Sequence, residues 1–304
     1  MKRAFPWHVI VFLAPALLVY SLFSALPLID TLRLGFYATS ESGHHSFTGL
    51  SNYATILLDP QWSHAFWNAM WNNLKFFLIH MLLQNPIGLA LATLFSLKGL
   101  KGERSYRTLI FLPTLLSVVI IGFIWQLILS PLWGVGESLL TCVGLADIFA
   151  PWLGQESTAL LTIALISVWQ YIGIPMMLIY AALLAVPEEI VEAAHAEGAG
   201  ALRIFWDIKL PLIWPTLGLV TILTFVANFN AFDLVYSVKG ALAGPNYATD
   251  ILGTLFYRTF FGYQAQIGSP TMGAAVATLM FLVILAGVGV YFFFVQRKLT
   301  RYEL

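Results

Sequence analysis

Charged residues are scarce in this 304-residue sequence: Asp, Glu, Lys and Arg make up 10% of it, whereas hydrophobic residues make up 59%. Soluble domains carry about a quarter of their residues as charged side chains. So little charge excludes a soluble globular protein and predicts an integral membrane protein. At about 20 residues for each apolar span, about five to seven transmembrane helices would fit, and a large soluble domain would not.

Other residue types are rare or dispersed. The one cysteine, Cys142, excludes an intrachain disulfide and a multi-thiolate metal site. The six histidines are scattered, so we expect no metal site and no catalytic centre of a membrane-embedded enzyme. The net charge of zero argues against nucleic-acid binding, which normally shows as a basic patch. No G-x-x-x-x-G-K-S/T segment is present, so we expect no nucleotide cofactor on this chain.

Long apolar runs are what the sequence does have. They predict an all-α fold of six transmembrane helices, at about residues 8–29, 74–96, 106–129, 158–184, 213–236 and 270–296. We expect one transmembrane domain over residues 1–304. Its external loops are predicted at 30–73, 130–157 and 237–269, and one longer cytoplasmic loop is predicted at 185–212.

The basic residues give the orientation. Eleven of them lie at the two ends of the chain or in alternate loops: Lys2, Arg3, Lys98, Lys101, Arg104, Arg107, Arg203, Lys209, Arg297, Lys298 and Arg301. Four lie on the opposite side: Arg33, Lys75, Lys239 and Arg258. Because cytoplasmic loops carry the excess of Lys and Arg, we expect both termini and the 185–212 loop to be cytoplasmic.

The segment from Pro187 to Pro211 is mostly polar and lies between two apolar runs. Glutamates at 188, 189, 192 and 197 exclude it from the bilayer. A proline followed by acids is typical of a helix N-terminus, and Gly198 suits a left-handed end, so we expect a helix over about 187–197. A second short helix is predicted over 201–207. The result is an elbow beside the membrane with a smooth, small-residue surface suited to docking.

Polar and aromatic residues at membrane depth are the candidates for a solute pathway. They are Trp169, Gln170 and Tyr171 in the fourth predicted helix and Asn228, Asn230, Asp233 and Tyr236 in the fifth. Asp233 is costly at the centre of a span, so it is either a pathway residue or an interfacial residue near the outer end of the helix. In the second helix, His80, Gln84 and Asn85 are predicted to satisfy one another, the kink at Pro86 or a neighbouring helix.

The elbow contains a long pattern of residues at defined spacing: Glu192-Ala193-Ala194, then Gly198, then Ile208 and Leu210-Pro211. This pattern resembles the signature loop, or EAA loop, of permease subunits in bacterial binding-protein-dependent ABC importers. Flanking segments resemble the sugar-type branch, which includes maltose and glycerol-phosphate permeases. They are LAPALLVYSLFSALPLIDTL from Leu13, FTGLSNYATIL from Phe47, RTLIFLPTLLSVVIIGFIW from Arg107, SVWQYIGIPMMLIYAALLAVPEEIVEAA from Ser167 and FDLVY from Phe232.

The resemblance implies a type I ABC importer permease fold in the bacterial inner membrane. It implies that the elbow residues Glu192, Ala193, Ala194, Gly198, Ile208, Leu210 and Pro211 couple the helices to cytoplasmic ATPases, with Glu192 meeting a basic residue there. The implied partners are a second homologous permease, two ATPase subunits that bind ATP and Mg²⁺, and an extracytoplasmic solute-binding protein. The implied cargo is a sugar or related polyol.

Two positions depart from the family pattern. Glu197 stands where the family often has Asp, and the segment Lys239–Pro245 reads KGALAGP where a Gly-Gly-Pro turn is usual. An alternative function is an ion-gradient-driven secondary transporter of a small polar solute. Such a carrier is expected to show inverted repeats, broken helices or a chain of intramembrane acids. The sequence shows no clear repeat and one such acid, Asp233, and the elbow would have no role in that mechanism.

Overall fold

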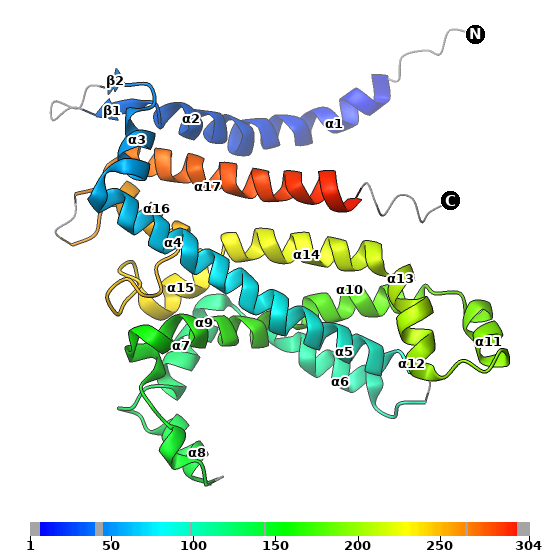
Figure 1. Ribbon diagram of the computed structural model, residues 1–304. Coiled ribbons are helices and arrows are strands. Elements are labelled where there is room, and N and C mark those ends of the chain that lie inside the picture. The colour runs from blue at the N-terminus through cyan, green and yellow to red at the C-terminus, as the bar shows by residue number, and fades with distance from the viewer. Residues whose placement is uncertain (1–6, 40–44, 98, 143, 265–266, 297–304) are drawn as a thin grey trace, which may run out of the picture. The chain divides into compact units, whose positions relative to one another are not determined.

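The computed structural model describes residues 7–39, 45–97, 99–142, 144–264 and 267–296, and most of them are helical (Figure 1). The chain forms two compact units. The first comprises Met1–Phe66 with Leu255–Phe281, and the second comprises Trp67–Thr254 with Leu282–Leu304. The predicted all-α membrane fold is confirmed, with one small β-hairpin as an addition.

Three helices within the described residues are long and apolar enough to cross a membrane: Ile10–Leu34, Pro60–Phe95 and Pro270–Phe293. Three further spans would each consist of two helices joined at a bend. They are Glu103–Leu115 with Val118–Ile128 (96°), Glu156–Tyr171 with Gly173–Leu184 (42°), and Ala201–Leu212 with Trp214–Phe229 (66°). Counting each bent pair as one span gives the predicted six. The cytoplasmic position of both termini stays a prediction, because Lys2, Arg3 and the C-terminal bases lie outside the described residues.

The first unit contains the N-terminal helices and a hairpin. Its elements are α1 (Trp7–Tyr20), η1 (Ser21–Ala25), α2 (Leu26–Leu34), β1 (Tyr37–Thr39), β2 (His45–Phe47), α3 (Ser51–Leu58), the start of α4 (Pro60–Ile79), most of α16 (Leu252–Phe261) and the start of α17 (Pro270–Val290). The strands pair antiparallel, with Tyr37 opposite Phe47. Asn52 fixes α3 under this hairpin, since its Nδ2 donates to the carbonyls of Gly35 (2.9 Å) and Tyr37 (2.8 Å).

The second unit holds the remaining elements. They are most of α4, η2 (His80–Gln84), α5 (Asn85–Phe95), α6 (Glu103–Phe111), η3 (Leu112–Leu115), α7 (Val118–Ile128), α8 (Val135–Cys142), η4 (Ala146–Ile148), η5 (Trp152–Gly154), α9 (Glu156–Tyr171), α10 (Gly173–Leu184), α11 (Glu188–Ala196), α12 (Ala201–Ile204), η6 (Phe205–Lys209), α13 (Leu210–Leu212), α14 (Trp214–Phe229), α15 (Phe232–Lys239), the start of α16, the end of α17 and η7 (Tyr291–Gln296).

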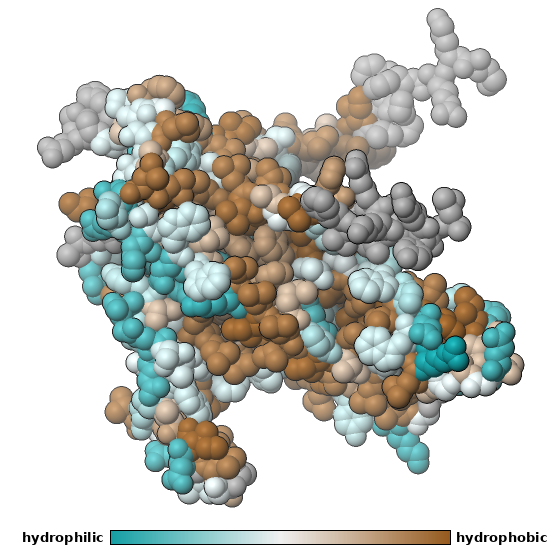
Figure 2. Space-filling view, in the orientation of Figure 1, coloured by the Kyte–Doolittle hydropathy of each residue, from teal (hydrophilic) through white to brown (hydrophobic). Residues whose placement is uncertain are grey.

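Two apolar cores organise this second unit. One joins α7, α9 and α15 through residues such as Ile121, Ile163 and Val235. The other joins α5, α10 and the start of α14 through residues such as Ala92 and Ile179. Apolar side chains also cover much of the outer surface of the helices (Figure 2), as expected of segments that face lipid or other membrane subunits.

Prolines account for three of the π-helical turns. The π-helical turns η1, η2 and η6 end two residues before Pro27, Pro86 and Pro211 respectively. Proline lacks an amide hydrogen and its ring clashes with the carbonyl four residues earlier, so a wider turn before it relieves the clash. Pro86 therefore lies inside one continuous helix, Pro60–Phe95, and the span is not broken there.

Two of the helix breaks lie against each other. Gly173, at the start of α10, allows this approach, because a Cβ there would lie 2.9 Å from the Phe111 Cα. The Thr114 hydroxyl donates to the Gln170 carbonyl (2.9 Å), and Gln170 Nε2 donates to the Leu116 carbonyl (3.3 Å). The side chains of one break thus satisfy backbone groups exposed by the other, as broken helices at membrane depth require.

A polar cluster joins α6 to α10 near the other end of these helices. The Tyr180 hydroxyl donates to Glu103 Oε1 (2.6 Å), and Arg107 Nε lies 3.3 Å from the same carboxylate oxygen. The Arg107 guanidinium also lies over the Tyr180 ring, 4.2 Å from its centroid. The cluster fixes the end of α10 four residues before Leu184, where the helix ends and the elbow follows.

Three predicted helix boundaries are wrong. The first span ends at Leu34 and not at about 29. The second span begins at Pro60, 14 residues before the predicted start at 74, because the polar stretch that begins it is helical without being apolar. The fifth span ends at Phe229 and not at 236. Asn230 caps it with its Nδ2 on the Val226 carbonyl (2.9 Å), and the separate helix α15 follows, so Asp233 and Tyr236 do not lie on the fifth span.

The predicted external loops contain structured elements. The 30–73 region includes the hairpin, α3 and the start of α4, and the 130–157 region includes α8 with two 3₁₀ turns. Lys239 ties the latter to α15, since its Nζ donates to the Leu153 carbonyl. Burial lowers the pKa of Lys239.

Candidate functional site

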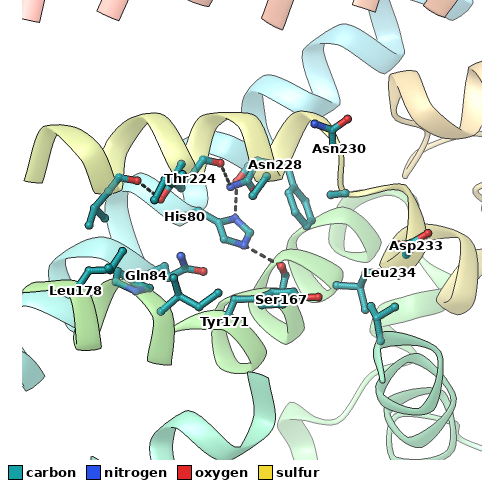
Figure 3. Close-up of a pocket in the computed structure, with 18 residues that line it drawn as sticks. His80, Gln84, Ser167, Tyr171, Leu178, Thr224, Asn228, Asn230, Asp233 and Leu234 are labelled. Carbon is teal, nitrogen blue, oxygen red and sulfur yellow. Dashed lines mark hydrogen bonds between the residues drawn. The ribbon is translucent and has the colours of Figure 1, made fainter. Parts of the chain in front are cut away.

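A cavity of about 460 Å³ lies within the second unit, between η2, α9, α10, α14 and the start of α15 (Figure 3). Its walls are mostly apolar, with residues such as Ile174, Leu178 and Leu223. The polar side chains that line it are those of His80, Gln84, Ser167, Tyr171, Thr224, Asn228, Asn230 and Asp233. An apolar hollow with a few convergent polar groups is the usual form of a small-molecule site.

His80 organises one wall of the cavity. It is buried, and its Nδ1 lies 2.8 Å from the Phe76 carbonyl while its Nε2 lies 2.9 Å from Ser167 Oγ. A carbonyl can only accept, so in the neutral ring Nδ1 carries the proton and Nε2 accepts from the Ser167 hydroxyl. His80 therefore pins the π-helical turn η2 to α9 (Figure 3).

Two amide oxygens in the cavity wall have no hydrogen-bond partner within the described residues. They are Gln84 Oε1 and Asn228 Oδ1, on side chains that are 5% and 4% exposed. The Asn228 amide nitrogen is occupied, since it donates to the Thr224 carbonyl (2.7 Å). A buried polar atom without a partner is costly, so both oxygens are suited to accept hydrogen bonds from a bound molecule.

The charge of the cavity has one sign. Among the described residues that line it, Asp233 carries a carboxylate and none is Lys or Arg. The cavity therefore offers acceptors and a negative charge to a ligand, and it offers no cation that would attract an anion. Hydrogen-bond donors such as hydroxyl groups fit this arrangement.

The structure brings four of the seven predicted pathway residues to the cavity: Tyr171, Asn228, Asn230 and Asp233. The other three lie elsewhere. Trp169 packs edge-on against Trp125 (5.6 Å between ring centroids), Gln170 is fully buried at the α6–α7 break, and Tyr236 stacks on Phe232. His80 and Gln84, which the sequence predicts to serve packing, also line the cavity, and so do Ser167 and Thr224, which no sequence pattern indicates.

The predicted partners of the polar residues in the second helix are partly right. His80 and Asn85 both bond to neighbouring helices, His80 to Ser167 and Asn85 Nδ2 to Thr224 Oγ1 (3.2 Å). Among the bonds that the described residues make, none joins His80, Gln84 and Asn85 to one another.

The elbow is the second feature that points to function. The predicted helices are present as α11 and as a longer helix over Ala201–Leu212. Gly198 has a φ of +84°, Ala199 N donates to the Ala194 carbonyl (2.9 Å) and Gly198 N donates to the His195 carbonyl (3.0 Å). These two bonds form a Schellman motif, so Gly198 is the left-handed residue that ends α11 and turns the chain toward α12.

The surface of the elbow is exposed and mixed in character. Glu192 and Ala193 are exposed on α11, and no atom lies within 4 Å of the position that a Gly198 Cβ would take. On the second helix of the elbow, two large apolar side chains are also exposed, Leu202 (77%) and Trp206 (60%). Figure 2 shows hydrophilic and hydrophobic residues side by side over this segment. An exposed surface of this kind is typical of a protein contact.

Long apolar helices, a cavity between them with a few polar groups in its walls, and an exposed elbow together define a polytopic membrane transport protein. The chain belongs to the family of inner membrane components of binding-protein-dependent transport systems, whose profile matches residues 84–301. The family that the elbow spacing predicted is thus confirmed.

Individual proteins agree with this assignment. The chain is 31% identical over 277 residues to YurN, a probable ABC transporter permease of Bacillus subtilis (strain 168), covering 90% of this chain and 91% of YurN. It is 29% identical over 289 residues to the arabinooligosaccharide transport system permease AraP of the same organism, covering 93% of this chain and 86% of AraP.

A solved structure supports the fold. A chain of a bacterial ABC transporter involved in the import of the acidic polysaccharide alginate superposes with a TM-score of 0.76 and 21% identity, covering 95% of this chain and 96% of that chain. The predicted ABC importer permease fold is confirmed by this match.

Proposed function

We propose that the chain forms half of the translocation pathway of an ATP-driven importer in the bacterial cytoplasmic membrane, with its elbow on the cytoplasmic side. A second, homologous permease subunit completes the pathway, and an extracytoplasmic binding protein delivers the solute. Two ATPase subunits bind ATP and Mg²⁺, and this chain contributes transport without catalysis or a cofactor of its own. The family description and the distribution of basic residues support this proposal.

The observation that carries the proposal is the geometry of the elbow. Gly198 ends α11 with a Schellman motif, and Glu192, Ala193 and Ala194 lie on that helix where a partner can reach them. The stretch from Ile208 through Leu210 and Pro211 continues into α13 and then α14, which forms a wall of the cavity. Movement imposed on α11 by an ATPase subunit is thereby passed toward the solute pathway.

We further propose that the solute is a neutral sugar or polyol. The cavity presents the unpaired oxygens of Gln84 and Asn228 together with the carboxylate of Asp233. All three accept hydrogen bonds, and hydroxyl groups supply the donors. A carboxylated sugar would bring a negative charge toward Asp233 with no Lys or Arg among the described lining residues to balance it. The arabinooligosaccharide permease among its relatives is consistent with this solute class.

A solute screen tests this assignment. The reconstituted complex, with its binding protein, is supplied in turn with neutral oligosaccharides, polyols and uronic-acid oligosaccharides while ATP hydrolysis is measured. We expect stimulation by a neutral, hydroxyl-rich compound and no stimulation by the uronic acids. Stimulation by the uronic acids alone would show that the solute class is wrong.

A further inference from the structure

The loop between α15 and α16 has an unusual backbone. Left-handed φ values occur at Gly240 (+67°), Ala243 (+46°), Asn246 (+44°) and Tyr247 (+57°). Three of these residues carry a side chain. Asn tolerates this region, but Ala243 and Tyr247 adopt it only when their surroundings hold them there. The loop therefore has a shape that neighbouring elements impose on it.

Two asparagines on one face of α4 impose part of this shape. Asn68 Nδ2 donates to the Tyr247 carbonyl (3.0 Å). Asn72, one turn later, donates to the carbonyls of Ala248 (3.1 Å) and Asp250 (2.9 Å). Side chains four residues apart lie on the same face of a helix, so the pair forms a seat for the loop. These bonds from Asn68 and Asn72 are all made to carbonyls of the loop.

The next residue, Asn73, bonds both to the end of the loop and to α14. Its Oδ1 accepts from the Leu252 amide (2.8 Å), where the loop ends and α16 begins. Its Nδ2 donates to the Asn228 carbonyl (3.0 Å), in the last turn of α14. The side chain is 0% exposed, so both bonds are made away from water. Asn73 thus holds the end of the loop and the end of α14 with one amide group.

Asn228 also lines the cavity. Its own side chain donates to the Thr224 carbonyl, and its Oδ1 is one of the two unpaired oxygens described above. A shift of the Asn228 backbone therefore moves a hydrogen-bond acceptor in the cavity wall. The loop lies in the region 237–269, which the distribution of Lys and Arg predicts to be on the extracytoplasmic side of the membrane.

We propose that Asn73 is a positioning residue that transmits the position of the 240–252 loop to the cavity wall at Asn228. A binding protein that displaces this loop would move Leu252, Asn73 and the end of α14 together. This inference rests on the proposed function for the identity of the external partner. The connection between loop and wall is a property of the chain itself.

The test uses the complete complex in proteoliposomes with its binding protein. Asn73→Asp keeps an acceptor for the Leu252 amide and replaces the donor to the Asn228 carbonyl with an oxygen. Asn72→Ala is the matched control, because it loosens the loop without touching α14. We expect Asn73→Asp to lower the ratio of stimulated to basal ATP hydrolysis about tenfold at saturating binding protein. Asn72→Ala should raise the half-saturating concentration of binding protein and keep the maximal ratio.

Asn73→Ser gives a second, milder variant, since one hydroxyl cannot span both partners. We expect a smaller loss of the stimulated ratio from it. Unaltered ratios in both Asn73 variants would overturn the proposal, and so would a loss that Asn72→Ala reproduces in full.

A labelling experiment separates this inference from the proposed function. In a Cys142→Ala background, Ala227→Cys places a thiol on the cavity lining one residue before Asn228. Asn73→Asp should change its rate of reaction with a small maleimide, whereas Asn72→Ala should leave the rate unchanged. If the unaltered complex does not respond to a binding protein but the labelling rate changes, the proposed function fails and the link through Asn73 stands. An unchanged labelling rate in Asn73→Asp would refute the link itself.

Discussion

Replacing Gly198 with valine is expected to reduce solute import about tenfold or more, with the subunit still inserted in the membrane. Gly198 has a φ of +84°, and a left-handed conformation costs a side-chain-bearing residue about 1–2 kcal/mol, with a β-branched residue among the least tolerant. Because about 1.4 kcal/mol is a factor of ten in an equilibrium constant, the elbow would rarely adopt the turn at residue 198 that an ATPase subunit would bind. Uptake by the reconstituted complex and the amount of subunit in the membrane are the two measurements.

The controls for this prediction use the same surface. Ala196→Val adds the same branched side chain to an exposed position at the last residue of α11, where the backbone is helical. Gly198→Asn places a residue that tolerates the left-handed region at the turn itself. Both should transport at rates close to that of the unaltered protein. Import by Gly198→Val at the rate of Ala196→Val would mean that the shape of the turn does not matter for coupling.

Replacing Gln84 with methionine is expected to weaken transport without weakening the fold. The thioether side chain has nearly the length of the amide but cannot accept a comparable hydrogen bond. Losing one hydrogen bond to the solute costs about 0.5–1.5 kcal/mol, which corresponds to a rise of about two- to tenfold in the KM for transport. At the same time the unpaired Gln84 Oε1 is removed from a buried site, so the Tm should stay the same or rise.

This combination distinguishes a binding role from a packing role. Leu178→Met changes another residue of the cavity wall with little change in volume and no change in polarity, and it should alter neither KM nor Tm appreciably. If Gln84→Met lowers the Tm and leaves the KM unchanged, Gln84 supports the helix packing and does not contact the solute.

The elbow could be predicted because its signals are local. Pro187, the acids that follow it and Gly198 determine where α11 begins and ends without reference to any other helix. The same holds for the long apolar runs, which mark the spans by composition alone. The end of the fifth span was missed because the apolar pattern continues past Asn230, whereas the asparagine side chain caps the helix there.

The cavity could be predicted only in part because it depends on which helices meet. His80 reaches Ser167 across 87 residues of sequence, and Asn85 reaches Thr224 across 139 residues. The sequence predicts Gln170 in the pathway because it is polar and lies in an apolar run. The bend after Tyr171 instead turns it toward the break at Leu116, where it satisfies a backbone carbonyl. No periodicity in the sequence specifies that bend or the neighbour that fills it.

The energy source for uptake tests the central claim most directly. Proteoliposomes that contain this subunit with its co-purified partners are supplied either with ATP and Mg²⁺ on the ATPase side or with an imposed proton or sodium gradient, and radiolabelled solute uptake is followed. The proposed mechanism predicts uptake that requires ATP and the external binding protein, and that Gly198→Val lowers about tenfold or more. Gradient-driven uptake by the subunit alone, without ATP and unaffected by Gly198→Val, would contradict it and would identify a secondary transporter.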